Sequence, residues 1–181
     1  ERKSSGRPLH KIIFTQKFIV AVLAASSGYA AMSLLMTSTP LAMAACNFEF
    51  IHSAQVIQWH VVGMYAPSFF TGALIKRFGT YRIMEFGAII LGVCILLNIS
   101  GTALINFWIG SILLGISWNF LFIGGTALVT ETYKTSEKAK VQGINDFLVF
   151  GSVAFSSVLS GVLHSLIGWQ NMNLTVVPLV C

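Results

Sequence analysis

The chain has 181 residues, of which 55% are hydrophobic and only 9% carry a formal charge, and its mean hydropathy is +0.79. Soluble domains usually carry about a quarter charged residues, so this composition excludes an ordinary soluble domain and fits a polytopic membrane protein. The net charge of +5 comes from basic residues at the edges of apolar segments, which is typical of membrane topology and unlike a nucleic-acid-binding patch, so we expect no nucleic-acid partner.

Six apolar segments follow a basic N-terminal stretch, residues 1–17, which we interpret as a cytoplasmic linker. A membrane-spanning helix needs about 20 residues, and the first five segments are long enough. The sixth is shorter, so we expect a truncated last helix. The sequence therefore predicts an all-α membrane protein with a six-helix transmembrane bundle over residues 18–181. The segments are 18–45, 54–75, 81–99, 103–130, 141–164 and 170–181.

All eleven Lys and Arg residues fall on alternate connections between these segments. They are Arg2, Lys3, Arg7, Lys11 and Lys17 before the first segment, Lys76, Arg77 and Arg82 after the second, and Lys134, Lys138 and Lys140 after the fourth. Alternate connections lie on one face of a membrane, and the positive-inside rule assigns that face to the cytoplasm. The pattern predicts an integral, multi-pass protein with a cytoplasmic N-terminus and cytoplasmic basic loops.

An internal repeat relates the two halves of the chain. "GALIKRFGTYRIM", residues 72–84, matches "GVLHSLIGWQNMN", residues 161–173, at an offset of 89 that aligns Gly79 with Gly168. The same offset pairs Tyr29 with Trp118. The first copy follows the second segment and the second copy follows the fifth, on opposite faces of the membrane. The sequence thus predicts a 3+3 inverted repeat, a recurrent design of secondary transporters.

The segment beginning at residue 72 resembles the signature of the major facilitator superfamily, G-x-L-x-D-R-x-G-R-[RK], which that family carries after its second and eighth helices. The matching residues are Gly72, Leu74, Arg77 and Gly79, with Arg82 nearby. Lys76 replaces the acidic residue, a degeneracy usual in the second copy. "ETYKTSEKAKVQGIND" looks like the companion segment, with Glu131 as its acidic member. The resemblance implies helices seven to twelve of a permease of bacterial type, in the inner (plasma) membrane.

The resemblance also implies partners and a mechanism. The chain would form one of two six-helix bundles that alternate access to a central cavity. Its partners would be the N-terminal six-helix half, the lipid bilayer and a small-molecule solute. The signature residues would form a cytoplasmic gate of Gly72, Arg77, Gly79, Arg82 and Glu131. A salt bridge from Glu131 to Arg77 or Arg82 would hold that side closed; the alternative is a solvated interfacial pair, which stabilises little.

Ionisable residues inside a membrane are costly and are functional candidates by default. His60, near the middle of the second segment, and Asp146, inside the fifth, are the proton-coupling candidates. For His60 the alternative is a hydrogen bond between helices. For Asp146 it is an ion pair at the cytoplasmic interface, with Lys138, Lys140 or a cation of another helix.

Polar and aromatic residues at helical spacing in the first, second and fourth segments are candidates for lining the cavity. They are Tyr29, Ser33, Gln58, His60, Trp118, Asn119 and Phe122. Amide and phenol groups can orient a solute by hydrogen bonds, and aromatic rings provide π contacts. The alternative is helix packing through small residues, which fits the serines and glycines best.

No pattern for catalysis or cofactor binding is present in the sequence. Cys46, Cys94 and Cys181 lack metal-ligand spacing, and no phosphate-binding loop occurs. We expect no enzyme, metal or cofactor, but half of a secondary active transporter that moves a small solute by alternating access, with proton coupling as the finer hypothesis. The alternatives are a non-transporting membrane scaffold or subunit and a six-helix homodimer.

Overall fold

A computed structural model describes residues 6–180; residues 1–5, which include Arg2 and Lys3, and Cys181 lie outside the described part. The described chain is helical throughout, without strands. Its elements are α1 (His10–Ile13), α2 (Gln16–Ala45), α3 (Phe50–Tyr65), α4 (Ser68–Phe78), α5 (Thr80–Ser100), α6 (Leu104–Thr130), η1 (Thr135–Glu137), α7 (Lys138–Leu174) and η2 (Val177–Leu179). This confirms the predicted all-α architecture.

Four helical stretches are long and apolar enough to cross a membrane. They are Gln16–Ala45, Thr80–Ser100, Leu104–Thr130 and Thr135–Leu174. The predicted second span is divided into α3 and α4 because Pro67, which has no backbone N–H, interrupts the helical ladder. The predicted sixth span is the end of α7, after a sharp turn at Gly168.

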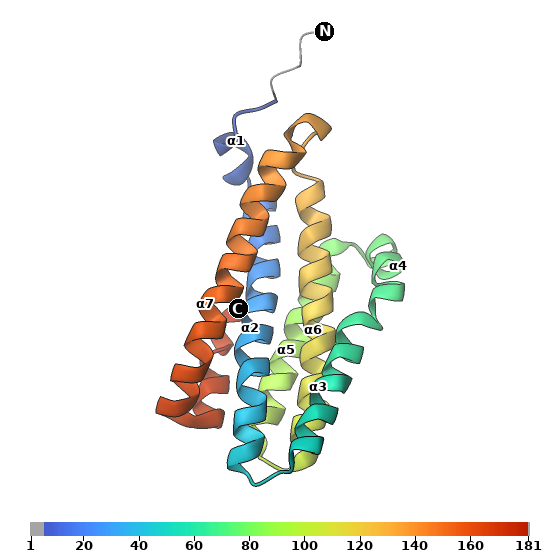
Figure 1. Ribbon diagram of the computed structural model, residues 1–181. Helices are drawn as coiled ribbons and strands as arrows, with labels where there is room; N and C mark the ends of the chain where they lie inside the picture. Colours follow the sequence, from blue (N-terminus) through green and yellow to red (C-terminus); the bar gives the residue numbers. More distant parts are fainter. Residues whose placement is uncertain (1–5, 181) are drawn as a thin grey trace.

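Two glycines mark the internal repeat in the backbone. Gly79 (φ 91°) separates α4 from α5, and Gly168 (φ 74°) turns α7. They are the glycines with positive φ in the described chain, and they are the pair that the sequence offset of 89 aligns. Only glycine adopts such angles without strain. The α4–α5 connection and the turn within α7 lie toward opposite ends of the bundle (Figure 1), as an inverted repeat requires.

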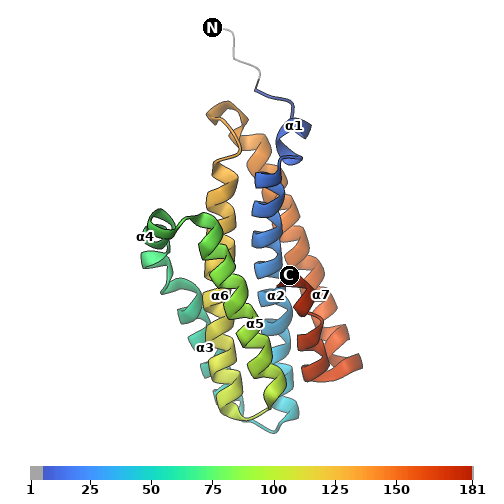
Figure 2. The same cartoon turned by 180° about the vertical axis from the view of Figure 1, so that it is seen from behind.

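The helices are arranged in two layers. Figure 1 shows α7, α2, α6 and α3 side by side. Figure 2, the view from the opposite side, shows α5 and the end of the chain in front of these four helices. We call the side formed by α7, α2, α6 and α3 the front face. α6 is the central helix, since it packs against α2, α3 and α5.

Glycines allow the close helix crossings in this arrangement. A Cβ at Gly115 of α6 would lie 2.5 Å from the His60 carbonyl of α3, and one at Gly125 would lie 2.6 Å from the Ala21 carbonyl of α2. Small residues at such contacts let backbones approach closely, which is how membrane helices gain packing energy.

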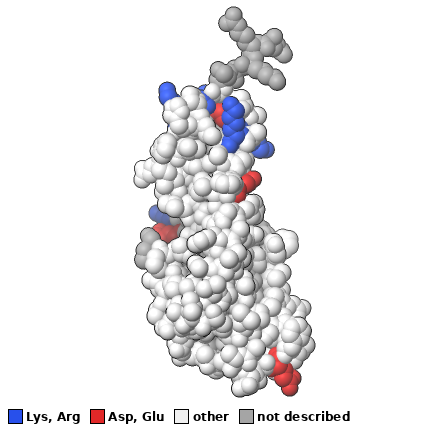
Figure 3. Space-filling model, turned by 60° about the vertical axis from the view of Figure 1, so that its left-hand side comes forward, with Lys and Arg blue, Asp and Glu red and all other residues white. Residues whose placement is uncertain are grey.

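Charged side chains are concentrated at one end of the molecule. Figure 3 shows most of the visible Lys and Arg side chains toward the end where α6 meets α7, above a surface that is almost entirely uncharged. At this end the stretch before α2 packs onto the bundle, with Ile12 of α1 1% exposed.

Candidate functional site

Five aromatic side chains from four helices meet on the front face; we call Tyr29, Tyr65, Trp118, Phe122 and Phe150 the aromatic cluster. Trp118 and Phe122, one turn apart on α6, are stacked with ring centroids 5.0 Å apart and planes at 15°. Tyr29 of α2 stands edge-on to both rings, at 5.3 and 5.2 Å. These arrangements are those that aromatic pairs prefer, so the three rings brace one another.

Two exposed rings flank this braced centre. Tyr65 of α3 contacts Trp118 at 6.1 Å, and Phe150 of α7 contacts Tyr29 at 5.9 Å. They are 58% and 52% exposed, whereas Trp118 is 5% exposed. Helical spacing could have found Tyr65, because it lies two turns from Gln58. Nothing in the sequence singled out Phe150, which reaches Tyr29 only through the packing of α7 on α2.

Two buried polar atoms near the cluster have no hydrogen-bond partner among the described residues: Nε1 of Trp118 and Oγ of Ser26. Ser26 lies one turn before Tyr29 on α2. Most buried polar atoms in proteins are paired, so such unpaired atoms are unusual. They add one N–H donor and one hydroxyl group to the phenol groups of Tyr29 and Tyr65.

Two of the candidate cavity residues are instead helix-joining residues. Asn119 is fully buried, and its Nδ2 donates to the Met64 carbonyl and to Ser68 Oγ, both at 2.6 Å, while its Oδ1 accepts from Thr71 Oγ1 at 2.7 Å. This amide bridges the break between α3 and α4, and with no exposed surface it cannot contact a solute in this conformation. Ser33 Oγ lies 2.6 Å from Ser157 Oγ, between α2 and α7.

His60 is 1% exposed, and its Nδ1 lies 2.8 Å from the Ser111 carbonyl of α6. The structure therefore has the interhelical hydrogen bond, the simpler of the two interpretations, while Nε2 has no partner among the described residues. Gln58 is exposed on another side of α3 from His60. It lies two turns before Tyr65 on the same helical stripe.

Asp146 is exposed on α7, one turn before Phe150. Its Oδ1 accepts a hydrogen bond from Asn145 Nδ2 at 3.1 Å. Within the described residues it forms no ion pair with Lys138 or Lys140, so the interfacial pairing considered for it is not present in this conformation.

The charged residues of the predicted gate are not paired as expected. Glu131 forms an ion pair with Lys17 at 3.1 Å, both about half exposed, and not with Arg77 or Arg82. The Arg77 guanidinium instead lies 5.2 Å from the ring of Phe78. Gly72 lies within α4 and Gly79 at its end, and Arg82 is exposed in the first turn of α5.

A second ion pair at the same end was not predicted. Three nitrogens of Arg7 donate to the Glu137 carboxylate: N at 2.6 Å, Nε at 3.0 Å and Nη2 at 2.8 Å. Nη2 also donates to the Thr132 carbonyl at 2.8 Å, and the Lys134 N–H donates to Glu137 at 2.9 Å. The hydrogen bonds from Arg7, then that from Lys134, lower the pKa of Glu137 to about 2. The residues are 130 positions apart, and no local pattern links them.

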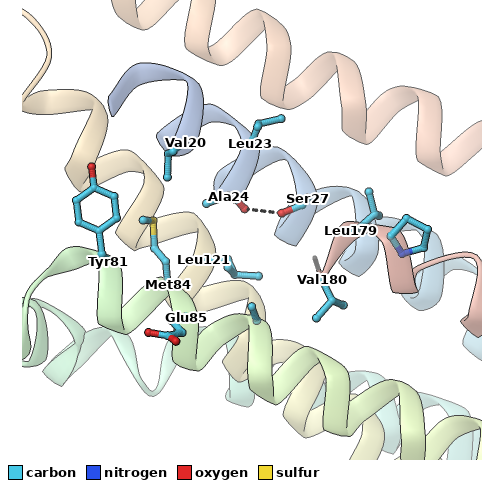
Figure 4. Close-up of a pocket in the computed structure, with 12 residues that line it drawn as sticks. Val20, Leu23, Ala24, Ser27, Tyr81, Met84, Glu85, Leu121, Leu179 and Val180 are labelled. Atoms are coloured by element: carbon cyan, nitrogen blue, oxygen red, sulfur yellow. Dashed lines mark hydrogen bonds between the residues drawn. The ribbon is translucent and has the colours of Figure 1, made fainter. Parts of the chain in front are cut away.

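A hollow lies on the side of the bundle away from the aromatic cluster. It has a volume of about 420 Å³ between α2, α5 and η2 (Figure 4). Its walls are mostly apolar, with Leu23 and Ala24 of α2 opposite Met84 of α5, and Glu85 is the charged residue at its edge. None of the candidate residues lines it. In the described part of the chain no three His, Cys, Asp or Glu side chains are arranged to hold a metal ion.

Comparison with known proteins decides the family. The sequence profile described as Major Facilitator Superfamily matches residues 21–181. The chain belongs to the major facilitator superfamily. This confirms the family that the signature at Gly72–Arg82 indicated, and with the apolar helices it makes the chain part of an integral, multi-pass membrane protein.

Members of the superfamily with curated descriptions include three bacterial relatives. The chain is 43% identical, over 97% of its length, to the riboflavin transporter RfnT of Brucella anthropi, and covers 44% of that protein. It is 35% and 36% identical, over 73% and 74% of its length, to the uncharacterized MFS-type transporters YdeG and YddS of Bacillus subtilis, covering 31% and 32% of them. The chain thus spans less than half of each relative. No solved structure gives a significant match.

Proposed function

We propose that this chain is the C-terminal half of a secondary transporter that moves riboflavin, or a solute with the same ring system, by alternating access. The observation that carries the proposal is the 43% identity, over 97% of the chain, to a protein named as a riboflavin transporter. The resemblance extends over the helices that form the front face, so solute-binding residues fall within the compared region.

The half-transporter assignment is supported by length and by the helix order. The chain covers 44% of its riboflavin-transporting relative, and its repeat glycines, Gly79 and Gly168, are those expected of the 3+3 repeat of one superfamily half. The partner is then the N-terminal six-helix bundle, which faces the front face across the solute pathway. We assign the assembly to a bacterial inner membrane with its basic end in the cytoplasm, because Lys and Arg cluster there and the compared relatives are bacterial.

Proton coupling belongs to the same proposal. Asp146 is the better-placed candidate because its exposed carboxylate lies one turn from Phe150 of the aromatic cluster. It lies eight residues, or about 12 Å, along α7 from Lys138. His60 is held by Ser111, so we give it the second place. The gate of Gly72, Arg77, Gly79, Arg82 and Glu131 remains part of the proposal, with Lys17 as the partner of Glu131 in this conformation.

The test is uptake by the full-length transporter that contains this segment. The protein is expressed in a bacterial riboflavin auxotroph and, separately, reconstituted in proteoliposomes with an imposed pH gradient. We expect growth at low external riboflavin and accumulation of labelled riboflavin that collapses when the gradient is dissipated. A protein shown to be folded by a cooperative thermal transition, but that moves no riboflavin in either assay, would overturn the proposal. Absence of flux with every solute tested would favour the scaffold.

A further inference from the structure

We propose that the aromatic cluster is the site that binds the ring system of an uncharged, planar heteroaromatic solute, the class to which the isoalloxazine ring of riboflavin belongs. The ring stacks against Tyr65 and Phe150, and the Trp118 indole N–H and the Ser26 hydroxyl hydrogen-bond to its edge. This inference rests on the proposed function and adds to it the residues and the part of the solute that they recognise.

The centre of the site is pre-formed. Trp118 and Phe122 are stacked at 15°, and Tyr29 stands at 89° and 88° to them, so none of the three rings can turn without losing contact with the others. Their positions are fixed further by the close packing of α2 on α6, where a Cβ at Gly28 would lie 2.7 Å from Leu121 Cβ. A rigid site avoids the cost of ordering side chains when the solute binds.

The flanks of the site are open. Tyr65 and Phe150 come from the two outer helices of the front face, α3 and α7, and each leaves more than half of its surface exposed. Each also touches the braced centre, Tyr65 through Trp118 and Phe150 through Tyr29. Exposed ring faces on both sides of a rigid aromatic floor favour a flat π system, because stacking acts on any aromatic face.

The two unpaired polar atoms would orient the bound ring. Nε1 of Trp118 is a donor only, and Oγ of Ser26 both donates and accepts. Both atoms are buried and have no hydrogen-bond partner among the described residues, and the whole of Trp118 is only 5% exposed. Leaving a buried donor unpaired is costly, whereas an acceptor on a heterocycle satisfies it. The Trp118 ring contacts the exposed Tyr65 ring, so a rotation of Tyr65 is the movement that would open the indole to a solute.

The charge of the site limits the ligand to an uncharged ring. The aromatic cluster and Ser26 carry no formal charge, and along the four contributing helices the charged residue nearest in sequence is Asp146, four positions before Phe150. A charged ring would lack an ion-pair partner among these residues, and burying an unpaired charge is strongly unfavourable.

Fluorescence quenching by the purified full-length transporter tests the site directly. Riboflavin and lumichrome, which carries the ring system without the ribityl chain, are titrated, with ribitol as the negative ligand. The variants are Trp118→Phe, which keeps a ring and removes the N–H, Ser26→Ala, and Tyr65→Leu, whose exposed position makes it the variant safest for folding. Trp108→Phe is the matched control, because it makes the same change on α6 at ten residues, about 15 Å, from Trp118.

We expect Trp118→Phe and Tyr65→Leu each to raise the dissociation constants of riboflavin and lumichrome by about fivefold or more, with weaker quenching for Tyr65→Leu and no change for Trp108→Phe. If the wild type transports riboflavin but both variants bind it with unchanged affinity and quenching, this inference fails while the proposed function stands. If the wild type moves no riboflavin, lumichrome decides: binding that depends on Trp118 supports the ring site, and absence of binding overturns it.

Discussion

The rings of Tyr29 and Trp118 meet edge to face, 5.3 Å apart, although 89 residues separate them in the chain. The same offset separates Gly79 from Gly168, the two glycines with positive φ. Tyr29 and Trp118 therefore occupy matching positions in the two copies of the repeat, and their contact joins α2 to α6. The aromatic cluster includes this contact and draws its rings from all four helices of the front face.

The Arg7–Glu137 pair predicts a pH-dependent stability. The pKa of Glu137 is lowered to about 2 from an ordinary value of 4.5. Its contribution to the free energy of unfolding is therefore fully present above pH 4.5 and is lost as the pH falls toward 2. We expect Glu137→Gln to lower the melting temperature of the full-length protein in detergent at pH 7, and the difference from wild type to narrow between pH 4.5 and 3. Glu131→Gln, which removes a half-exposed pair, is the control. A difference that stays constant with pH would contradict the assignment.

Asn119→Ala is expected to destabilise the protein by about 1–3 kcal/mol or more, because the Met64 carbonyl, Ser68 and Thr71 lose their partner at the α3–α4 break. Asn171→Ala is the comparison: Asn171 is exposed and makes one hydrogen bond to its own helix, so a change within about 0.5 kcal/mol is expected. Denaturant or thermal unfolding measures both. Equal losses of unfolding free energy in the two variants would show that Asn119 does not stabilise the α3–α4 break.

Gly115→Ala is expected to disrupt the α3–α6 crossing, because the new Cβ would lie 2.5 Å from the His60 carbonyl, a backbone atom that cannot move aside. Overpacking of this kind typically costs about 1–3 kcal/mol. Gly151→Ala makes the same change where nothing lies within 4 Å and is expected to be neutral or to stabilise α7 by up to about 1 kcal/mol. The melting temperature of Gly115→Ala should therefore fall below that of the wild type, while that of Gly151→Ala should stay the same or rise.

Gly79→Ala and Gly168→Ala are each expected to lower the free energy of unfolding by about 1–3 kcal/mol, because alanine is strained at a positive φ. A Cβ has open space at both positions, but φ is 91° and 74°. Gly143→Ala, also in open space but within an ordinary helical stretch, is the matched control. If all three variants unfold alike, the turns at the two repeat glycines do not require glycine.

Asp146→Asn is expected to uncouple solute from protons. Since the exposed carboxylate is the proposed proton carrier, the variant should lose riboflavin accumulation driven by a pH gradient while keeping exchange of labelled for unlabelled riboflavin across proteoliposomes. His60→Ala should instead lower stability, because His60 is buried and bonded to Ser111. Gradient-driven accumulation that survives Asp146→Asn would remove this residue from the coupling mechanism.

Hydropathy predicted four of the six segments as helices long enough to cross a membrane, because such a segment is defined by the composition of about 20 residues at a time. The repeat glycines were found because their φ angles are required by the turn and leave a mark in the sequence. Helical spacing identified Tyr29, Trp118 and Phe122, three members of the aromatic cluster.

Spacing gives the side of a helix, not the neighbour that covers it. Asn119 and Ser33 lie on stripes that looked suited to a cavity, yet α3–α4 and α7 cover them. Phe150 joins the cluster only through tertiary packing, and the partners of Glu131 and Glu137 come from the stretch before α2. Contacts between residues more than 100 positions apart cannot be read from one sequence without the packing of the helices.

The attachment of Arg7 to Glu137 has a mechanical consequence. A force applied at residue 7 acts on α2 through the chain and on α6 and α7 through Glu137. This is because three nitrogens of Arg7 donate to the Glu137 carboxylate, which lies in the connection between α6 and α7. The helices that carry Tyr29, Trp118 and Phe150 are thus connected at this end through one arginine as well as through their own packing.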